Sequence, residues 1–140
     1  MTSLGGMVAE LEYQDAESPF LLNFLVREDA RGKLKAIEFT EIPFQVNRYF
    51  AISVTGPDLF RGRHAHKECW QAFFSCLGSQ EIVIKNLSGV ETHVLKPDQL
   101  LIVPPYNWCE IRFNSNNSIM GVLASHPYDQ EDYLIAEPPL

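Results

Sequence analysis

The chain has 140 residues, 46% of them hydrophobic and 21% charged, which suits one soluble globular domain with a core of its own. Its formal net charge of −7 argues against a nucleic-acid binder that works through bulk electrostatics. No apolar run approaches the roughly 18 residues of a membrane-spanning helix, and the N-terminus lacks the basic and apolar regions of a signal peptide, so we expect no membrane association.

Short strand-like segments follow one another along most of the chain. Residues 1–18 have weak periodicity and several acidic side chains, which predicts a peripheral N-terminal arm, and residues 19–140 are expected to form one domain. Runs of apolar, β-branched and aromatic residues predict strands over 20–26, 34–39, 46–54, 80–85, 91–95, 100–103, 108–113 and 119–125. Turns rich in Gly, Pro and Asn separate these runs, and residues 129–135 are expected to form a short helical or extended lid. The pattern predicts an all-β sandwich or barrel, and a barrel of this size encloses one small ligand.

The stretch from Arg61 to Gly78 carries the strongest functional signal. Its histidines, His64 and His66, are two residues apart, so on a strand both imidazoles would lie on one face, about 7 Å apart. On a helix the pair would diverge by about 200° and could not share a substrate. The preceding turn and the aromatic residues from Trp70 onward favour the strand. Two polar residues on a solvated face are the alternative, but the surrounding basic, amide and aromatic side chains favour a pocket.

Basic residues gather in the same part of the chain. Arg48, Arg61, Arg63 and Lys67 lie within twenty residues of one another, whereas the acidic residues concentrate toward the two ends. A chain of negative total charge can therefore still form a positive pocket, and we expect that pocket to suit an anionic ligand.

The three cysteines, Cys69, Cys76 and Cys109, form no CxxC pair. An odd set without such a pair is typical of free thiols in a reducing compartment, so we expect a cytoplasmic protein. Cys109 is expected to be a buried packing residue rather than a nucleophile, because the sequence fixes no base beside it.

The spacing of the histidine stretch resembles the first motif of the cupins, which are barrels of the double-stranded β-helix or jelly-roll type. His64, His66 and Gly78 fit its two histidines and closing glycine, while Gln71 stands where cupins usually carry a metal-binding Glu. The second motif is matched in spacing up to Cys109, which stands at its histidine. The resemblance implies a cupin with two of its usual four metal ligands replaced, so we expect no metal and no other cofactor. Zinc held by two histidines, a cysteine and an amide is the alternative.

A closer resemblance is to the sugar-nucleotide 3,4-ketoisomerases, the WxcM-like cupins that act on dTDP-4-keto-6-deoxyglucose. It rests on the pattern RG-x-HAHK-x3-Q, which runs from Arg61 to Gln71. Weaker matches lie at 42–44, 48–49, 103–105, Trp108, Glu110, 122–125, 128–129 and 131–133. One departure is Cys109, because the family often has a histidine between that Trp and that Glu.

The resemblance implies an isomerase that moves the keto group from C4 to C3 of the sugar through an enediol, in the biosynthesis of deoxy or amino-deoxy sugars for lipopolysaccharides or other glycans. It also implies a dTDP-sugar substrate, no redox cofactor and a homodimer that exchanges strands. His64 and His66 are the expected proton-transfer pair, because an imidazole with a pKa of about 6.5 can act as base and then as acid. Which of the two is the base stays open, and Tyr49 is the expected hydroxyl donor.

Other residues near the motif are candidates for binding the substrate. Arg61 is expected to contact an oxyanion or a phosphate, and Arg48 a second phosphate. Gln71 is expected to hydrogen-bond a sugar hydroxyl or a histidine. The rest of the expected binding set is Lys67, with Tyr106 and Trp108 as candidates for stacking on the nucleotide base.

Three other functions stay open at this point. A sugar-nucleotide 3,5-epimerase of the same fold also uses a His base and a Tyr acid in a metal-free pocket. A non-catalytic cupin would bind the nucleotide sugar and leave its protons unexchanged. A metal-dependent oxygenase is disfavoured by Gln71 and Cys109, which replace two metal ligands.

Overall fold

A computed structural model describes residues 12–56 and 60–139 of the chain. The elements in these ranges are almost all strands. They are β1 (Phe20–Asn23), β2 (Leu25–Asp29), β3 (Gly32–Ala36), the 3₁₀ helix η1 (Phe39–Glu41), β4 (Arg48–Ser53), β5 (Phe60–His66), β6 (Gln71–Leu77), β7 (Gln80–Asn86), β8 (Gly89–Val94), β9 (Gln99–Val103), β10 (Trp108–Phe113), β11 (Ile119–Ala124), the 3₁₀ helix η2 (Gln130–Asp132) and β12 (Tyr133–Leu134). Among the described residues, no helix is long and apolar enough to span a membrane.

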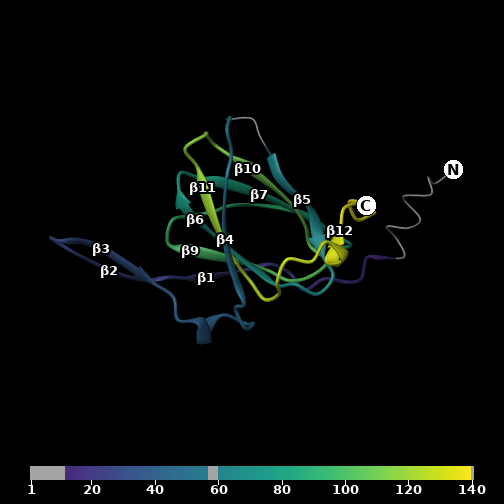
Figure 1. Cartoon of the computed structure of the whole chain (residues 1–140), viewed down its shortest axis with the longest axis horizontal. Helices are drawn as coiled ribbons and strands as arrows, with labels where there is room; N and C mark the ends of the chain where they lie inside the picture. Colours follow the sequence, from purple (N-terminus) through teal and green to yellow (C-terminus); the bar gives the residue numbers. More distant parts are fainter. Residues whose placement is uncertain (1–11, 57–59, 140) are drawn as a thin grey trace.

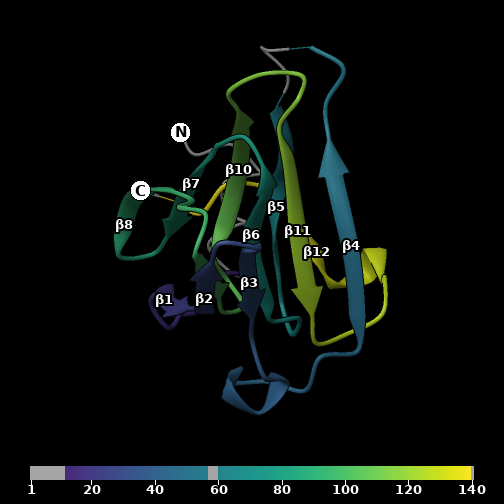
Figure 2. The ribbon, with the colours of Figure 1, turned by 90° about the vertical axis from the view of Figure 1, so that its left-hand side faces the viewer.

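Two five-stranded antiparallel sheets form the body of the molecule (Figures 1 and 2). One sheet has the strand order β1-β9-β6-β11-β4, and the other has the order β12-β5-β10-β7-β8. Strands that are neighbours in a sheet come from distant parts of the chain, as in a jelly roll. The all-β class and the cupin fold expected from the sequence are therefore confirmed, as is a strand for the histidine pair.

The main core lies between the two sheets. Strand β10 shows how the sequence builds it, because Ile111 and Phe113 alternate with polar neighbours and join this core with Cys109. Strands β9 and β11 are instead buried along almost their whole length. A second cluster on the outer face of their sheet, which includes Ile42 and Leu123, accounts for this. Burying each such aliphatic side chain contributes about 1.5–3 kcal/mol.

The predicted strand over 20–26 is wrong in its extent, because it is two strands that break at Phe24. The ring of Phe24 packs edge-on against Phe74 of β6, with ring centroids 5.8 Å apart. Beyond this break, β2 and β3 form a separate hairpin that projects away from the sheets (Figure 1). The predicted strand over 34–39 likewise ends early, at Ala36.

Both ends of the described chain pack against the second sheet. The hydroxyl of Tyr13 donates a hydrogen bond of 2.6 Å to the carbonyl of Ala136, and Tyr13 packs with Trp108 and Leu134. Most of the predicted arm, residues 1–11, lies outside the described residues. The predicted lid over 129–135 consists of η2 and β12, which pairs with the end of β5 that carries His66.

Candidate active site

A cavity of about 260 Å³ opens between the two sheets, beside the histidine strand. Its polar lining comes from Arg48, Arg61, His64 and Gln71, which lie on strands β4, β5 and β6. Its apolar lining includes Phe50, Phe73, Ile111 and Val122 from the main core. Two tyrosines that follow β11, Tyr128 and Tyr133, complete one side. The cavity thus combines an apolar floor with two guanidinium groups and one imidazole.

A β-bulge in β5 places His64 in this cavity. The pairing of β5 with β10 shifts between Cys109 and Glu110, and the two residues before His64 have left-handed φ angles of +83° at Gly62 and +63° at Arg63. A Cβ at position 62 would lie 3.0 Å from the carbonyl oxygen of Cys109, so only glycine fits there. The Nε of Arg63 lies 3.2 Å from the buried carboxylate of Glu110, which fixes the bulged residue from the outer side.

His64 is held as a neutral imidazole with one nitrogen free for chemistry. Its Nδ1 lies 3.1 Å from the carbonyl oxygen of Gly62, and because a carbonyl only accepts, Nδ1 must carry the ring proton. Nε2 is then the proton acceptor. Burial lowers the pKa of His64 from its ordinary value of 6.5, so the ring is uncharged at neutral pH. Its plane is stacked on Tyr133, with ring centroids 4.0 Å apart.

His66 lies beside His64, with ring centroids 5.0 Å apart and the two planes at 71°. Its Nδ1 is 2.9 Å from Oδ2 of Asp132, and its Nε2 is buried without a hydrogen-bond partner among the described residues. Burial is the main cause that lowers the pKa of His66, and the hydrogen bond to Asp132 opposes it. His66 therefore stands behind the residue that lines the cavity.

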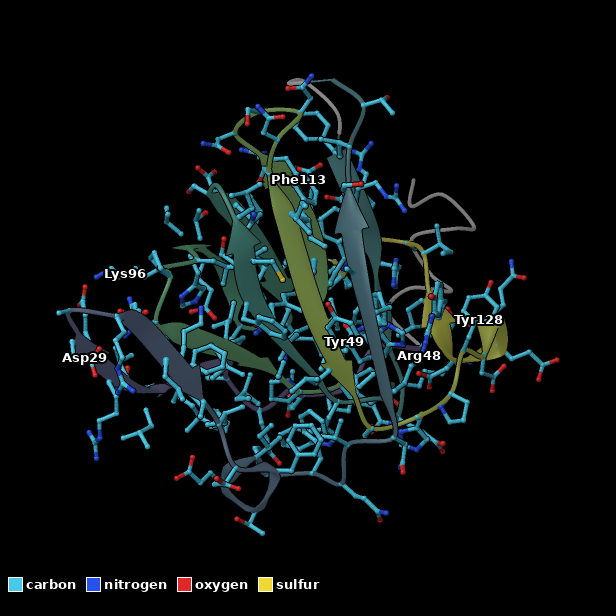
Figure 3. The ribbon with its side chains drawn as sticks, turned by 60° about the vertical axis from the view of Figure 1, so that its left-hand side comes forward. Asp29, Arg48, Tyr49, Lys96, Phe113 and Tyr128 are labelled. Carbon is cyan, nitrogen blue, oxygen red and sulfur yellow. The ribbon has the colours of Figure 1, made fainter. Side chains whose placement is uncertain are left out.

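The segment after β11 encloses the cavity through aromatic contacts. Tyr133 is stacked on His64, and Tyr128 meets Tyr133 edge-on with ring centroids 6.0 Å apart. The guanidinium carbon of Arg48 lies 4.3 Å from the ring centroid of Phe50 and 5.6 Å from that of Tyr128. Arg48 and Tyr128 are both labelled in Figure 3. These contacts join β4 to the C-terminal segment across the cavity opening.

The structure brings together five of the residues singled out in the sequence. Arg48, Arg61, His64 and Gln71 line the cavity, and His66 contacts His64. His66 and Gln71 belong to elements on either side of the 67–70 turn.

Tyr49 is placed away from the cavity, contrary to the expected role of hydroxyl donor. It follows Arg48 on β4, and because neighbouring strand residues point to opposite faces, only one of the two can face inward. Arg48 lines the cavity, while Tyr49, which is labelled near it in Figure 3, is 58% exposed and stacks on Phe74.

The expected stacking residues are also placed elsewhere. Trp108 and Cys109 are neighbours on β10, and it is Cys109 that lines the cavity. Trp108 is 3% exposed on the outer side, packs with Tyr106 and donates a hydrogen bond of 3.1 Å to the carbonyl of Ile135. Lys67 is exposed in the turn after β5 and is absent from the cavity lining. Lys67, Tyr106 and Trp108 are therefore not placed to bind a ligand in this cavity within one chain.

Sequence reasoning missed Asp132, Tyr128 and Tyr133 as individual site residues. They lie more than sixty positions after the histidine strand, and no spacing rule connects the two segments. Their match to the end of the ketoisomerase pattern was the only signal, and it marked the segment without assigning a role.

The residues at the cupin metal positions do not form a ligand set in the described part of the chain. Burial raises the pKa of Cys109 to about 12, so its thiol is protonated at neutral pH. Within residues 12–56 and 60–139, the one group of three metal-ligating side chains with donor atoms inside 4.8 Å is His66, Cys69 and Asp132. The carboxylate in that group already accepts hydrogen bonds from His66 and from two backbone N–H groups.

Comparison with known proteins shows which family this chain resembles over most of its length. The FdtA family, described as WxcM-like, C-terminal, matches residues 18–137. A TDP-4-oxo-6-deoxy-alpha-D-glucose-3,4-oxoisomerase from Aneurinibacillus thermoaerophilus is 35% identical over 116 residues, which cover 81% of this chain and 84% of the relative.

Two solved structures with a TM-score near 0.8 share the arrangement of strands. The sugar 3,4-ketoisomerase QdtA from Thermoanaerobacterium thermosaccharolyticum, solved in complex with TDP, has a TM-score of 0.79 and 31% identity, and the match covers 84% of this chain and 88% of QdtA. A variant of QdtA has been solved with TDP-4-keto-6-deoxyglucose. A 3,4-ketoisomerase from Helicobacter canadensis has a TM-score of 0.78 and 37% identity, with 84% of this chain and 90% of that protein covered.

Proposed function

This chain belongs to the FdtA family of WxcM-like domains, and we propose that it is an isomerase that moves the keto group of TDP-4-keto-6-deoxyglucose from C4 to C3. The observation that carries the proposal is His64, a half-buried neutral imidazole with a free Nε2, which lines a cavity together with two arginines. The named activities of the relatives and their complexes with TDP and the 4-keto sugar support the choice of substrate.

The reaction needs two proton movements and no net oxidation. The C3–H bond breaks and a C4–H bond forms, while the hydroxyl proton on the C3 oxygen is lost and the C4 oxygen gains one. Both movements pass through an enediol, in which C3 and C4 share a double bond. The protein must therefore supply a base near the two carbons, a donor near the two oxygens and a site that excludes water.

We assign the carbon proton to His64. Its Nε2 takes the proton from C3 because Nδ1 is already committed to the Gly62 carbonyl. The resulting imidazolium then returns a proton to the neighbouring carbon, C4, on the same face of the sugar. A pKa that burial holds below 6.5 keeps the ring in its basic form at neutral pH before each turnover.

We assign the oxygen side of the reaction to Tyr133 and the two arginines. Burial raises the pKa of Tyr133, so its hydroxyl stays protonated at neutral pH and can donate toward the developing oxyanion. Arg48 and Arg61 supply positive charge for the diphosphate and for the enediolate in a chain whose net charge is −7. Gln71 offers an amide to a sugar hydroxyl.

We propose a homodimer with strand exchange because the β2–β3 hairpin exposes apolar side chains. The hairpin of β2 and β3 leaves Leu25 and Leu34 exposed at 52% and 58%, and a two-stranded hairpin by itself is marginally stable in water. A second copy that covers the hairpin would bury these side chains. A cytoplasmic location and a role in glycan biosynthesis are likewise proposals, and the three free cysteines agree with a reducing compartment.

The test is incubation of the purified protein with TDP-4-keto-6-deoxyglucose, followed by identification of the product by NMR. A 3-keto sugar with a new C4 hydroxyl is the predicted product. A 4-keto sugar inverted at C3 or C5 would make the protein an epimerase. Binding of the nucleotide sugar without turnover would instead indicate a binding module.

A further inference from the structure

The carboxylate of Asp132 joins the C-terminal segment to the histidine strand. Its Oδ2 lies 2.9 Å from Nδ1 of His66 and accepts a longer hydrogen bond, 3.3 Å, from the backbone N–H of Cys69. Its Oδ1 accepts a hydrogen bond of 2.8 Å from the backbone N–H of Glu68. Its own backbone carbonyl accepts from the N–H of Lys67 at 2.9 Å. The backbone of the turn that follows β5 therefore holds Asp132 in place, independently of its contact with His66.

This geometry determines which nitrogen of His66 carries the proton. An ionised carboxylate accepts hydrogen bonds and donates none, so Nδ1 of His66 must be the donor. Nε2 is then a lone-pair acceptor, and it is buried without a partner among the described residues. Leaving a buried polar atom unpaired is costly, so such an atom in a native protein calls for an explanation.

We explain the unpaired Nε2 by the position of the His66 ring beside the reacting groups. The ring stands edge-on to His64 at 5.0 Å and to Tyr133 at 4.7 Å, so it adjoins both groups that the proposed reaction uses. When His64 takes a carbon proton it becomes a cation, and the Asp132 carboxylate is the negative charge behind the histidine pair. An Asp that orients a histidine through Nδ1 is a known arrangement in other enzymes, where that histidine itself becomes charged. Here Asp132 contacts His66 and acts on the charge of His64 through space.

We infer that Asp132 is a positioning residue for the histidine pair: it holds His66 in the Nδ1–H form, with Nε2 unprotonated behind His64, and it stabilises the imidazolium that forms on His64 during turnover. This inference rests on the proposed function for its kinetic part. The tautomer of His66 is a property of the resting protein and does not depend on that function.

The first experiment measures the tautomer in the unaltered protein. Nitrogen-15 NMR of the imidazole nitrogens, assigned with His66→Gln, distinguishes Nδ1–H from Nε2–H. The Nδ1–H form is expected for His66. An Nε2–H form or a rapid mixture of the two in the wild-type protein would overturn the inference, whether or not the protein turns over a sugar.

The second experiment compares Asp132→Asn with Glu131→Gln. The asparagine can still accept from the Glu68 N–H through its oxygen, but its NH₂ group then faces His66 and favours the Nε2–H form. Glu131→Gln removes the same charge from the neighbouring residue of η2, whose side chain is exposed and forms no ion pair with His66 among the described residues. We expect Asp132→Asn to lower kcat by roughly 10²- to 10⁴-fold with KM changed by less than about threefold, and Glu131→Gln to change neither.

Two outcomes would contradict the positioning role even in a folded variant. One is a kcat for Asp132→Asn within about threefold of the wild type although the tautomer of His66 has changed. The other is a large loss of kcat with the tautomer unchanged, which would mean that Asp132 acts only by anchoring the C-terminal segment. If neither the wild type nor the variants convert TDP-4-keto-6-deoxyglucose, the proposed function fails, while the tautomer measurement still decides the placement of His66.

Discussion

The imidazole of His64 lies flat on the ring of Tyr133, with ring centroids 4.0 Å apart and ring planes 6° apart. The two residues lie 69 positions apart in the sequence and meet because β12 pairs with β5, with Tyr133 opposite His66. The stack leaves His64 one edge bound to the Gly62 carbonyl and the other edge toward the cavity. A base on one strand and a hydroxyl on another are thereby held in one rigid unit.

Removing the hydroxyl of Tyr133 tests whether it acts as a donor rather than only as a support. Tyr133→Phe keeps the ring that stacks on His64, so we expect the fold and TDP binding to be unchanged and kcat to fall by roughly 100-fold. Steady-state kinetics with TDP-4-keto-6-deoxyglucose measure this. Tyr49→Phe is the matched control, because Tyr49 lies outside the cavity, and it should stay within about twofold of the wild type. A kcat for Tyr133→Phe within about threefold of the wild type would remove Tyr133 from the mechanism.

The arginines of the cavity are expected to hold the nucleotide diphosphate. A hydrogen bond to a charged group contributes about 1.5–3 kcal/mol, so Arg48→Gln and Arg61→Gln should each weaken TDP binding by roughly 10- to 100-fold. Isothermal titration calorimetry with TDP measures the change. Lys67→Gln removes a positive charge from the adjacent turn without touching the cavity and should leave Kd nearly unchanged. Equal losses in all three variants would indicate a general charge effect instead of specific contacts.

The bulge before His64 predicts a marked difference between two glycines. Gly62 has a φ of +83° and its added Cβ would press on the Cys109 carbonyl at 3.0 Å, whereas a Cβ at Gly56 would meet nothing within 4 Å. We expect Gly62→Ala to lower the free energy of unfolding by about 1–3 kcal/mol and to reduce kcat by moving His64. Gly56→Ala should change neither quantity measurably. Urea unfolding followed by fluorescence measures the stabilities, and equal stability of the two variants would contradict the strain assigned to the bulge.

The lowered pKa of His64 predicts the pH range in which kcat/KM falls on acidification. Burial lowers the pKa of His64 below 6.5, so the fraction of unprotonated base, and with it kcat/KM, should fall only as the pH drops below about 6.5. A profile of kcat/KM from about pH 5 to about pH 8 measures this limb. A half-point above 6.5 would contradict a half-buried neutral base. His126→Asn alters an exposed histidine outside the cavity and should leave the limb in place.

The lowered pKa values of His64 and His66 also predict that the protein loses stability on acidification. In the unfolded chain His64 and His66 regain ordinary pKa values, so below about pH 6.5 the unfolded state binds more protons than the folded state. The stability that these residues contribute is therefore complete above pH 6.5 and is lost as the pH falls through their lowered folded-state pKa values. Urea midpoints measured at several pH values test this, and a midpoint that rises on acidification over that range would contradict it.

The fold and the part of the site that lies on β5 and β6 could be predicted from the sequence. Alternation and turn residues predict the strands, and the spacing of His64 and His66 predicts that the two rings share a face, as they do. The motif also identifies the cavity residues Arg61 and Gln71, because Arg61 lies on β5 with the two histidines and Gln71 begins the next strand, β6. These inferences succeed because they depend on residues close together in the chain.

The rest required three-dimensional information. Arg48 and Tyr49 are consecutive on β4, and only the register of the sheet determines which of them faces inward. The same holds for Trp108 and Cys109 on β10. Asp132 reaches His66 through the pairing of β12 with β5, across 66 positions of sequence, and no local pattern predicts that pairing. The residues that sequence reasoning misplaced are those whose role depends on a long-range contact.

Isotope exchange in heavy water shows whether His64 is the group that moves the carbon proton. Wild-type protein and His64→Asn are each incubated with TDP-4-keto-6-deoxyglucose in heavy water and followed by proton NMR; the asparagine keeps a donor toward the Gly62 carbonyl but has no base. We expect a 3-keto product with the wild type, with deuterium at C4 wherever the proton on Nε2 exchanges with solvent before it returns to carbon. With His64→Asn we expect neither product nor exchange at C3, although TDP still binds. Formation of the 3-keto product at the wild-type rate in His64→Asn would contradict this role and assign the base to another residue.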